Sequence, residues 1–354
     1  MVTIREADEN DNEVLIELTS KCPMGTNLVI GHDSSPDFFV RSKAFEDWHV
    51  FVAHEHRKIA GSAACSINNI QFRGEPLKAA YLYGFMVDPE YRRRGIAAQL
   101  HKHIEDFAEQ NAVDLLYLTV VEDNSPAIRF FSKMGLTRVN DFAFLSLMVY
   151  KTHMLSGKAK IRPMRQNDLR EVVAMINNTY EDYELFRPFS MESFEEYIER
   201  IPYFDMSDIL VHESDGNIRA CVGYWDHSKV RRVIVQGYNW RFKMLTSFMR
   251  FIGLFTTVPR MPKPGEIYYS YYLVTPAYKD EESFSSLIKY VMNVGLRNGM
   301  HMINTPVDPE SPLSRILSRF RHGKIKMHLF VKSLNHQAAF HLSERKLYVD
   351  SVEM

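Results

Sequence analysis

The chain has 354 residues, with 43 Lys and Arg against 44 Asp and Glu and a formal net charge of −1. This length suits two domains better than one, and the near-neutral charge argues against general nucleic-acid binding. Three scattered cysteines, fourteen histidines without metal-ligand spacing and no run of about 20 apolar residues predict no disulfide framework, no metal site and no membrane span, so we expect a cytoplasmic protein.

Apolar periodicity in residues 1–150 predicts alternating strands and helices. Residues 22–46 are expected to form a loop and a helix. The other expected elements, in chain order, are Val2–Arg5 (strand), Asn10–Lys21 (helix), His49–His54, Ile59–Ile67 and Ala79–Val87 (strands), Ile96–Asn111 (helix), Leu115–Val121 (strand), Ser125–Met134 (helix) and Ala143–Val149 (strand).

The stretch from 81 to 97 carries the strongest chemical signal. An apolar strand ends at Val87, and a basic, glycine-containing loop then opens a helix at Ile96. The unpaired amides and positive dipole end of a helix N-terminus bind phosphate, and Gly95 lets a ligand approach the backbone closely. Three successive arginines at 92–94 add positive charge. We therefore expect a phosphate-binding loop at this place.

Two stretches resemble signatures of the Gcn5-related N-acetyltransferase (GNAT) superfamily. Arg92-x-x-Gly95-x-Ala97 resembles its acetyl-CoA loop, and Asn124 to Leu136 resembles its second motif of Asn, Ala, aromatic residues and a helix-ending Gly. The resemblance implies direct transfer of acetyl from acetyl-CoA to an amine of a small molecule or protein. The acetyl-CoA contacts that it implies are Phe85, Met86, Val87, Arg92, Arg93, Arg94, Gly95, Ile96, Ala97, Ala98, Asn124, Ala127, Phe130 and Phe131.

The groups that would move protons are less evident from the sequence. The family often has a Tyr where this chain has Phe131, and Phe cannot protonate the departing CoA thiolate. Neither strand at the predicted site carries an acid, so a base acting through water from Glu122 or Tyr83 is a hypothesis. The alternative for Glu122 is loop solubility with helix capping.

Residues 22–45 occupy the place of the family's substrate-side loop and helix. Asp33, Asp37 and Arg41 are candidates to bind an amine or carboxylate of the acceptor. The alternative is a surface loop with capping Asp and Ser side chains.

The second half of the chain repeats the order of elements of the first. Ile161–Asp168 echoes Ile4–Asp11, but Lys279-Asp-Glu-Glu-Ser283 stands in the place of the arginine loop, and its acids would repel a pyrophosphate. We expect an α/β (α+β type) fold of two tandem acetyltransferase-like domains, each a mixed, mostly antiparallel twisted sheet flanked by helices. The expected limits are an active domain at 1–150, a linker at 151–159, a degenerate copy at 160–335 and a C-terminal extension at 336–354.

Trp240–Phe255 has no counterpart in the first half. Its apolar residues at helical spacing, accompanied by Arg241, Lys243 and Arg250, predict either a core-facing helix or a surface for substrate, another chain or a membrane. Two other functions stay open: a non-catalytic CoA-binding module that recruits a partner, and transfer of a longer acyl or aminoacyl group. The sequence does not predict the oligomeric state.

Overall fold

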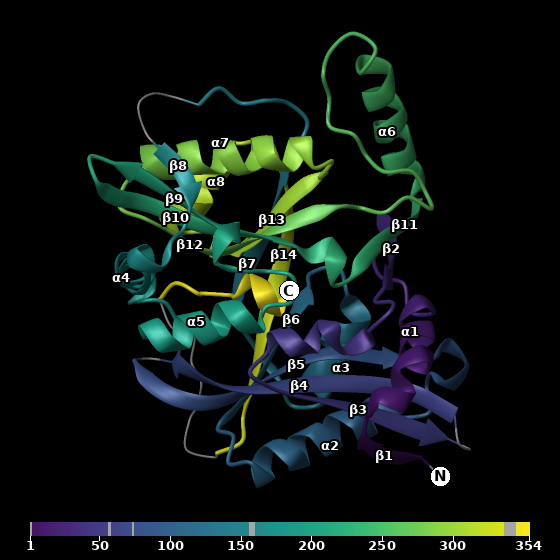
Figure 1. Cartoon of the computed structure of the whole chain (residues 1–354). Helices are drawn as coiled ribbons and strands as arrows, with labels where there is room; N and C mark the ends of the chain where they lie inside the picture. The colour runs from purple at the N-terminus through teal and green to yellow at the C-terminus, as the bar shows by residue number, and fades with distance from the viewer. Residues whose placement is uncertain (1, 56–57, 73, 156–159, 336–344) are drawn as a thin grey trace.

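Strands from both halves of the chain form one continuous sheet (Figure 1). The computed structural model describes residues 2–55, 58–72, 74–155, 160–335 and 345–354. The strands are β1 (Thr3–Glu6), β2 (Leu28–Asp33), β3 (Asp47–Glu55), β4 (Lys58–Phe72), β5 (Glu75–Val87), β6 (Leu115–Val121), β7 (Thr137–Met148), β8 (Lys160–Pro163), β9 (Ile209–Ser214), β10 (Asn217–Asp226), β11 (Arg232–Tyr238), β12 (Ser270–Tyr278), β13 (Met302–Val307) and β14 (His322–Ser333).

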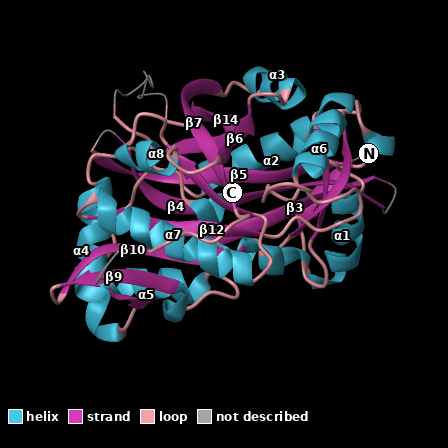
Figure 2. Ribbon diagram, turned by 90° about the horizontal axis from the view of Figure 1, so that it is seen from above, coloured by secondary structure: helices cyan, strands magenta, loops and turns pink. Residues whose placement is uncertain are grey.

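Helices lie on both sides of this sheet (Figure 2). In α2, buried Ile96, Leu100, Ile104 and Ala108 recur every four residues, so one face of the helix packs on β3, β4 and β5. The helices are α1 (Asn12–Ser20), α2 (Ile96–Gln110), α3 (Ser125–Lys133), α4 (Leu169–Tyr180), α5 (Met191–Arg200), α6 (Trp240–Ile252), α7 (Glu281–Arg297) and α8 (Pro312–Leu317).

The two halves share one topology and exchange strands. The order in the large sheet is β1-β3-β4-β5-β6-β14-β7-β13-β12-β10-β9-β8. Each half contains one parallel pair, β5 with β6 and β12 with β13, whereas the other neighbouring strands are antiparallel. Because β14 lies between β6 and β7, a strand from the second half completes the sheet of the first. The chain limits 1–150 and 160–335 stay predictions, and the sheet is not interrupted between them.

Residues 345–354 lie between the two halves, where the C label stands in Figure 1. Leu347 and Val349 are buried in the cluster that also holds α1 side chains, and Val352 is buried in the cluster of α4 and α5. Parts of the expected linker and extension, residues 156–159 and 336–344, lie outside the described residues.

Some elements differ from the expectation. Only short 3₁₀ turns, Phe38–Val40 and Ser42–Ala44, stand where a helix was expected within 22–46, and β2 was not foreseen. The partner of β2 is β11, which lies about 200 residues further along the chain, so local periodicity could not indicate the pair. No described helix is long and apolar enough to cross a membrane.

Strand exchange predicts that both halves unfold together. Phe330 on β14 is buried next to β6, and we expect Phe330→Ala to lower the free energy of unfolding by about 3–5 kcal/mol. Hydrogen-exchange labelling along a urea series reads peptides of β4 and β10 in one experiment, and both should lose protection at one lowered midpoint.

The matched control is Ile325→Ala on the same strand, because Ile325 is 46 % exposed and should cost less than about 1 kcal/mol. Separate urea midpoints for the peptides of β4 and β10 would contradict the joint unfolding of the two halves.

Candidate active site

The strands β5 and β6 separate in the first half of the chain. They pair only where Ala79–Tyr81 faces Leu115–Tyr117. Past this point Gly84 adopts φ +65° and the β4–β5 register shifts, which is the mark of a bulge. The bulge turns β5 away from β6, so the main chain of Phe85–Val87 lines an opening between the two strands.

The basic loop after β5 has a backbone suited to an anion. Arg93 has φ +63° and Gly95 has φ +79°, and Gly95 is the N-cap of α2. Successive amides around left-handed residues form a concave nest, and the first amides of α2 continue it. A Cβ on Gly95 would meet only Gln99 Nε2, at 4.0 Å, so the left-handed conformation rather than crowding calls for glycine.

The three arginines of this loop differ in their contacts. Arg94 pairs with Glu55 at 3.0 Å and lies over the Tyr91 ring, while Arg92 Nε donates to the carbonyl of Val87 at 3.3 Å. Within the described part of the chain, Arg93 has no ion-pair partner, and its side chain is exposed. Arg93 is therefore the arginine that is most available to an anion.

Aromatic rings fill the space between β5, α2 and α3. Phe131 packs edge-on against Phe85, with centroids 5.2 Å apart, and Phe130 packs against Phe131 at 5.0 Å. His101 of α2 joins them, and burial lowers its pKa to about 4, so it is neutral at pH 7. Asn124 caps α3 by accepting from the amide of Ala127 at 3.2 Å.

Three tyrosines lie over the start of the strand separation. Tyr81 stacks on Tyr83 and packs against Tyr117, with centroids 5.7 and 5.2 Å apart. Tyr83 is buried and donates to Ser42 Oγ at 2.9 Å, and burial raises its pKa well above the ordinary value. Tyr83 is thus a proton donor that stays neutral near pH 7, which does not suit the role of a base.

Glu353 is an acid that the sequence analysis missed. Its Oε1 accepts from Tyr117 Oη at 2.7 Å, and its carbonyl accepts from Tyr81 Oη at 2.9 Å. Burial, followed by the charge on Asp350, raises the pKa of Glu353 to about 8, although the hydrogen bond from Tyr117 acts in the opposite direction. No local pattern marks this residue, and only the folding of 345–354 into the centre places it beside the tyrosines.

Glu353 lines a pocket of about 110 Å³ between the two halves. Asp350 lies in the same pocket, where its two carboxylate oxygens share the hydroxyl of Tyr197, at 2.9 and 3.0 Å, and burial raises its pKa. Exposed Glu46 and Glu196 also line the pocket, as do Arg200 and Arg187, which pairs with Glu46 at 2.8 Å. The pocket therefore combines carboxyl groups with guanidinium groups.

The three residues that were expected to contact the acceptor substrate lie in different parts of the structure. Asp33 pairs with Arg232 at 2.7 Å, and Asp37 caps the turn at Phe39 and pairs with Lys43. These two carboxylates are engaged in local structure. Arg41 alone of the three reaches the centre, where it lies over the Tyr83 ring at 5.1 Å and donates to the carbonyl of Glu353 at 2.8 Å.

A second buried arginine, Arg231, lies near Arg41. Its Nη2 donates to the carbonyl oxygen of Met354 at 3.5 Å, and burial followed by the charge on Arg41 lowers its pKa to about 9. His32 and His227 are buried beside these arginines, and burial followed by the charge on Arg231 holds the pKa of each well below its usual value. Both histidines are therefore neutral at pH 7.

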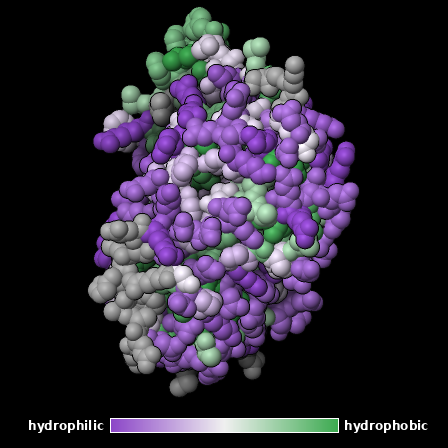
Figure 3. Space-filling view, turned by 90° about the vertical axis from the view of Figure 1, so that its left-hand side faces the viewer, coloured by the Kyte–Doolittle hydropathy of each residue, from purple (hydrophilic) through white to green (hydrophobic). Residues whose placement is uncertain are grey.

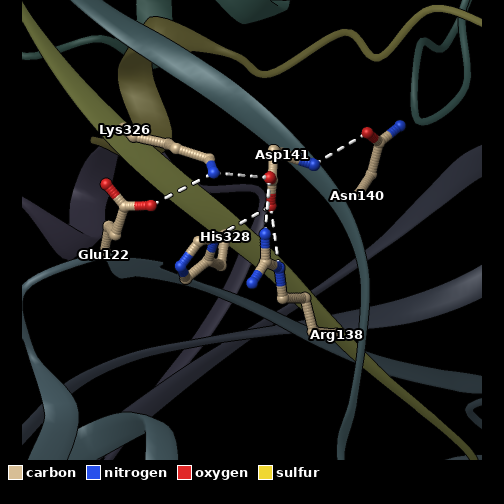
Figure 4. Close-up of polar contacts among 6 residues, drawn as sticks. All are labelled: Glu122, Arg138, Asn140, Asp141, Lys326 and His328. Atoms are coloured by element: carbon tan, nitrogen blue, oxygen red, sulfur yellow. Dashed lines mark hydrogen bonds and ion pairs between the residues drawn. The ribbon is translucent and has the colours of Figure 1, made fainter.

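Glu122 lies in a charged network at the end of β6 (Figure 4). Lys326 of β14 joins Glu122 at 3.1 Å and Asp141 at 3.2 Å, and Asp141 also binds Arg138 and buried His328. Burial raises the pKa of Asp141, but the hydrogen bonds from Arg138, His328 and Lys326 outweigh it and give about 2. The Glu122 carboxylate is half exposed and ion-paired, and its role as a base stays a prediction.

The corresponding place in the second half is closed to an anion. Asp280 caps α7 by accepting from the amide of Ser283 at 2.8 Å, and two further acids stand in the first turn of the helix. Arg219 and Arg319 neutralise Asp280 and Glu281. The helix N-terminus is thus occupied by the chain's own carboxylate, and that this half does not bind CoA stays a prediction. Among the described residues, no cluster of His, Cys, Asp and Glu could hold a metal ion.

Comparison with known proteins agrees with this geometry. Residues 15–136 match the acetyltransferase (GNAT) family. An uncharacterized N-acetyltransferase of Methanocaldococcus jannaschii is 25 % identical over 144 residues, which cover 38 % of this chain and 59 % of that protein. The chain thus spans about three-fifths of the length of this relative.

Solved structures share the fold of the whole chain. A Saccharomyces cerevisiae N-myristoyltransferase with bound myristoyl-CoA and inhibitors superposes with a TM-score of 0.66 at 12 % identity, covering 98 % of this chain and 85 % of that one. A GNAT protein from Sphaerobacter thermophilus gives 0.58 at 12 % identity, covering 97 % and 98 %. The match to the GNAT family thus covers residues 15–136, about a third of the chain, and the second half has the same topology but lacks the basic loop.

Proposed function

We propose that the chain is an acetyl-CoA-dependent N-acetyltransferase that acts on an amine held between its two halves. The observation that carries the proposal is the opening between β5 and β6, which leads directly to the left-handed loop at Arg93 and Gly95. A thioester substrate with a long pantetheine arm and a pyrophosphate needs such a slot and such a loop side by side.

In this proposal the chain binds acetyl-CoA through its main chain more than through its side chains. The amides from Arg93 to Ala98 and the Arg93 guanidinium hold the pyrophosphate, because residues 93–95 are exposed and, in the described chain, no side chain caps the start of α2. The main chain of Phe85–Val87 hydrogen-bonds the pantetheine arm. In this proposal the thioester lies where β5 leaves β6, next to Tyr81 and Tyr117.

The packing of rings favours a short acyl group. Phe85, His101, Phe130 and Phe131 lie within 6.4 Å of one another, centroid to centroid, on the α2 side of β5. A long acyl chain on that side would have to displace them, at a cost of about 1 kcal/mol or more for each disrupted contact. The likeness to the N-myristoyltransferase rests on the fold, so transfer of a longer acyl group is the alternative that chain-length assays decide.

Glu353 is the proton acceptor in this proposal. Its carboxylate accepts a proton from the ammonium form of the acceptor, and the free amine attacks the thioester carbonyl. As the C–N bond forms, the C–S bond breaks and CoA leaves as its thiolate; the attacking nitrogen loses its second proton to solvent, and the thiolate takes a proton from solvent. Tyr117 positions the carboxylate through its hydrogen bond of 2.7 Å.

We expect Gly95→Glu to weaken acetyl-CoA binding by about 100-fold or more, because the new carboxylate faces the pyrophosphate and a side chain strains φ +79°. Calorimetric titration with acetyl-CoA measures the affinity, and thiol release is followed in the same sample. Gly216→Glu is the control, since Gly216 has φ +73° in an open turn of the second half.

Wild-type affinity in Gly95→Glu would remove the phosphate site from this loop. Binding without thiol release, even in the presence of a panel of amines, would point instead to a CoA sensor.

We expect the wild-type rate to rise with pH until about 8 and then level off, because a base with its pKa there must lose its proton to act. Glu353→Gln should lower kcat about 10²–10⁴-fold, remove this rise and leave acetyl-CoA affinity unchanged. Glu196→Gln, on the rim of the same pocket, should keep the wild-type profile.

Glu122→Gln and Tyr83→Phe test the earlier hypothesis in the same assay. If either of them flattens the pH profile while Glu353→Gln retains it, the base is not Glu353.

A further inference from the structure

The helix α6 projects from the body of the molecule with an apolar stripe facing solvent. In Figure 1 it stands at the top, beyond the two-stranded sheet of β2 and β11. The sequence left open whether the apolar residues of this segment face the core or form a surface, and the core-facing alternative is wrong for the stripe. Six apolar side chains, each at least 60 % exposed, form it: Trp240, Met244, Phe248, Phe251, Leu254 and Phe255.

The stripe lies on one side of the helix. Trp240, Met244, Phe248 and Phe251 are spaced by four, four and three residues, which at about 100° per residue keeps them within a quarter of the circumference. Phe255 follows in the turn after the helix, and its ring lies 5.6 Å from that of Phe251. The green side chains at the top of Figure 3 lie at the height of α6. An apolar face of this kind on a soluble surface marks a site of interaction.

The opposite face of α6 is well supported. Thr246 is buried, and Met249 lines a small pocket with residues 258–261 of the returning loop. Asn239 caps the helix by accepting from the amide of Phe242, and the ring of Tyr238 stacks on that of Phe242. The helix is thus held in place while the side chains of its stripe stay largely exposed in the described chain.

The charges around the stripe have one sign. Residues 239–265 contain five Lys and Arg and no Asp or Glu. Arg241 and Lys243 are exposed and flank the stripe on its two sides, and Lys263 of the returning loop is exposed as well. Long basic side chains beside an aromatic stripe suit the boundary of an anionic bilayer, where rings enter the acyl region and ammonium and guanidinium groups meet headgroup phosphates.

We propose that α6 docks the protein onto an anionic lipid surface. The stripe inserts, and Arg241 and Lys243 on its two sides bind the headgroups; each such basic residue near the surface contributes about 1 kcal/mol. A protein groove or a second copy of the chain would bury the apolar stripe equally, but the uniformly positive surroundings favour the lipid.

The test is flotation of the full-length chain with phosphatidylcholine vesicles that contain about 30 % phosphatidylserine, a composition that gives a strongly negative surface. We expect binding, a blue shift of Trp240 emission, and weaker binding with pure phosphatidylcholine or at about 0.5 M salt. We expect the triple variant Phe248→Ser/Phe251→Ser/Phe255→Ser to bind the anionic vesicles at least about tenfold more weakly than the wild type. We expect the same of the double variant Arg241→Glu/Lys243→Glu.

The control is Met154→Ser/Tyr203→Ser, which removes two exposed apolar side chains elsewhere and should bind as the wild type does. Thermal melts check that every variant is folded. Failure of the wild type to float with the anionic vesicles, or undiminished flotation of the triple Phe variant, overturns the proposal. Sedimentation that shows a wild-type dimer dissolved by the triple Phe variant overturns it too, in favour of an interface between copies.

Discussion

The asymmetric pairing of β6 is the constraint on which the site depends. On one side β6 pairs with β14 along its whole length, from Leu115 to Val121, and on the other it pairs with β5 at only three positions. The strand supplied by the second half therefore holds β6 in the sheet while β5 bends away at Gly84. Without β14, β6 would have an unpaired edge and nothing to keep it apart from β5. The second half thus contributes to the opening although it has no anion-binding loop of its own.

The two halves show how the same topology can favour or exclude an anion. In the first half the N-terminus of α2 has a glycine cap and free amides, and arginines surround it. In the second half the N-terminus of α7 is capped by Asp280, and two more acids follow in the first turn. The helix dipole is the same in both, so the difference lies in whether the chain's own carboxylate already occupies the end.

The centre of the molecule combines opposite charges at low solvent exposure. Asp350 and Glu353 lie on one side, with raised pKa values, and Arg41 and Arg231 lie close by. Burial makes each charge more costly and each neighbour more influential, so a carboxyl group there titrates near neutral pH. A group of that kind serves proton transfer better than an exposed acid such as Glu122, whose charge is already matched by Lys326.

The sequence by itself determined the elements between residues 79 and 111 and the basic loop within them. Strand, turn, basic loop and helix are adjacent along the chain between residues 79 and 111, and their signals are local: apolar alternation, Gly95, and helical spacing from Ile96 onward. Local signals of this kind survive folding because each depends on backbone conformation within a few residues. The same holds for the acids that cap α7.

Only the tertiary structure decided what lies opposite that loop. The pairing of β2 with β11, the insertion of β14 beside β6 and the arrival of Glu353 at Tyr117 each join residues about 200 or more apart in sequence. Apolar periodicity does not indicate which distant segment will bury a given face. The pKa of Glu353, near 8, likewise results from its burial in the folded chain and not from its residue type. For the same reason the sequence did not decide whether the α6 stripe is exposed. The residue spacing identifies an apolar face, and only the fold determines whether another segment covers that face.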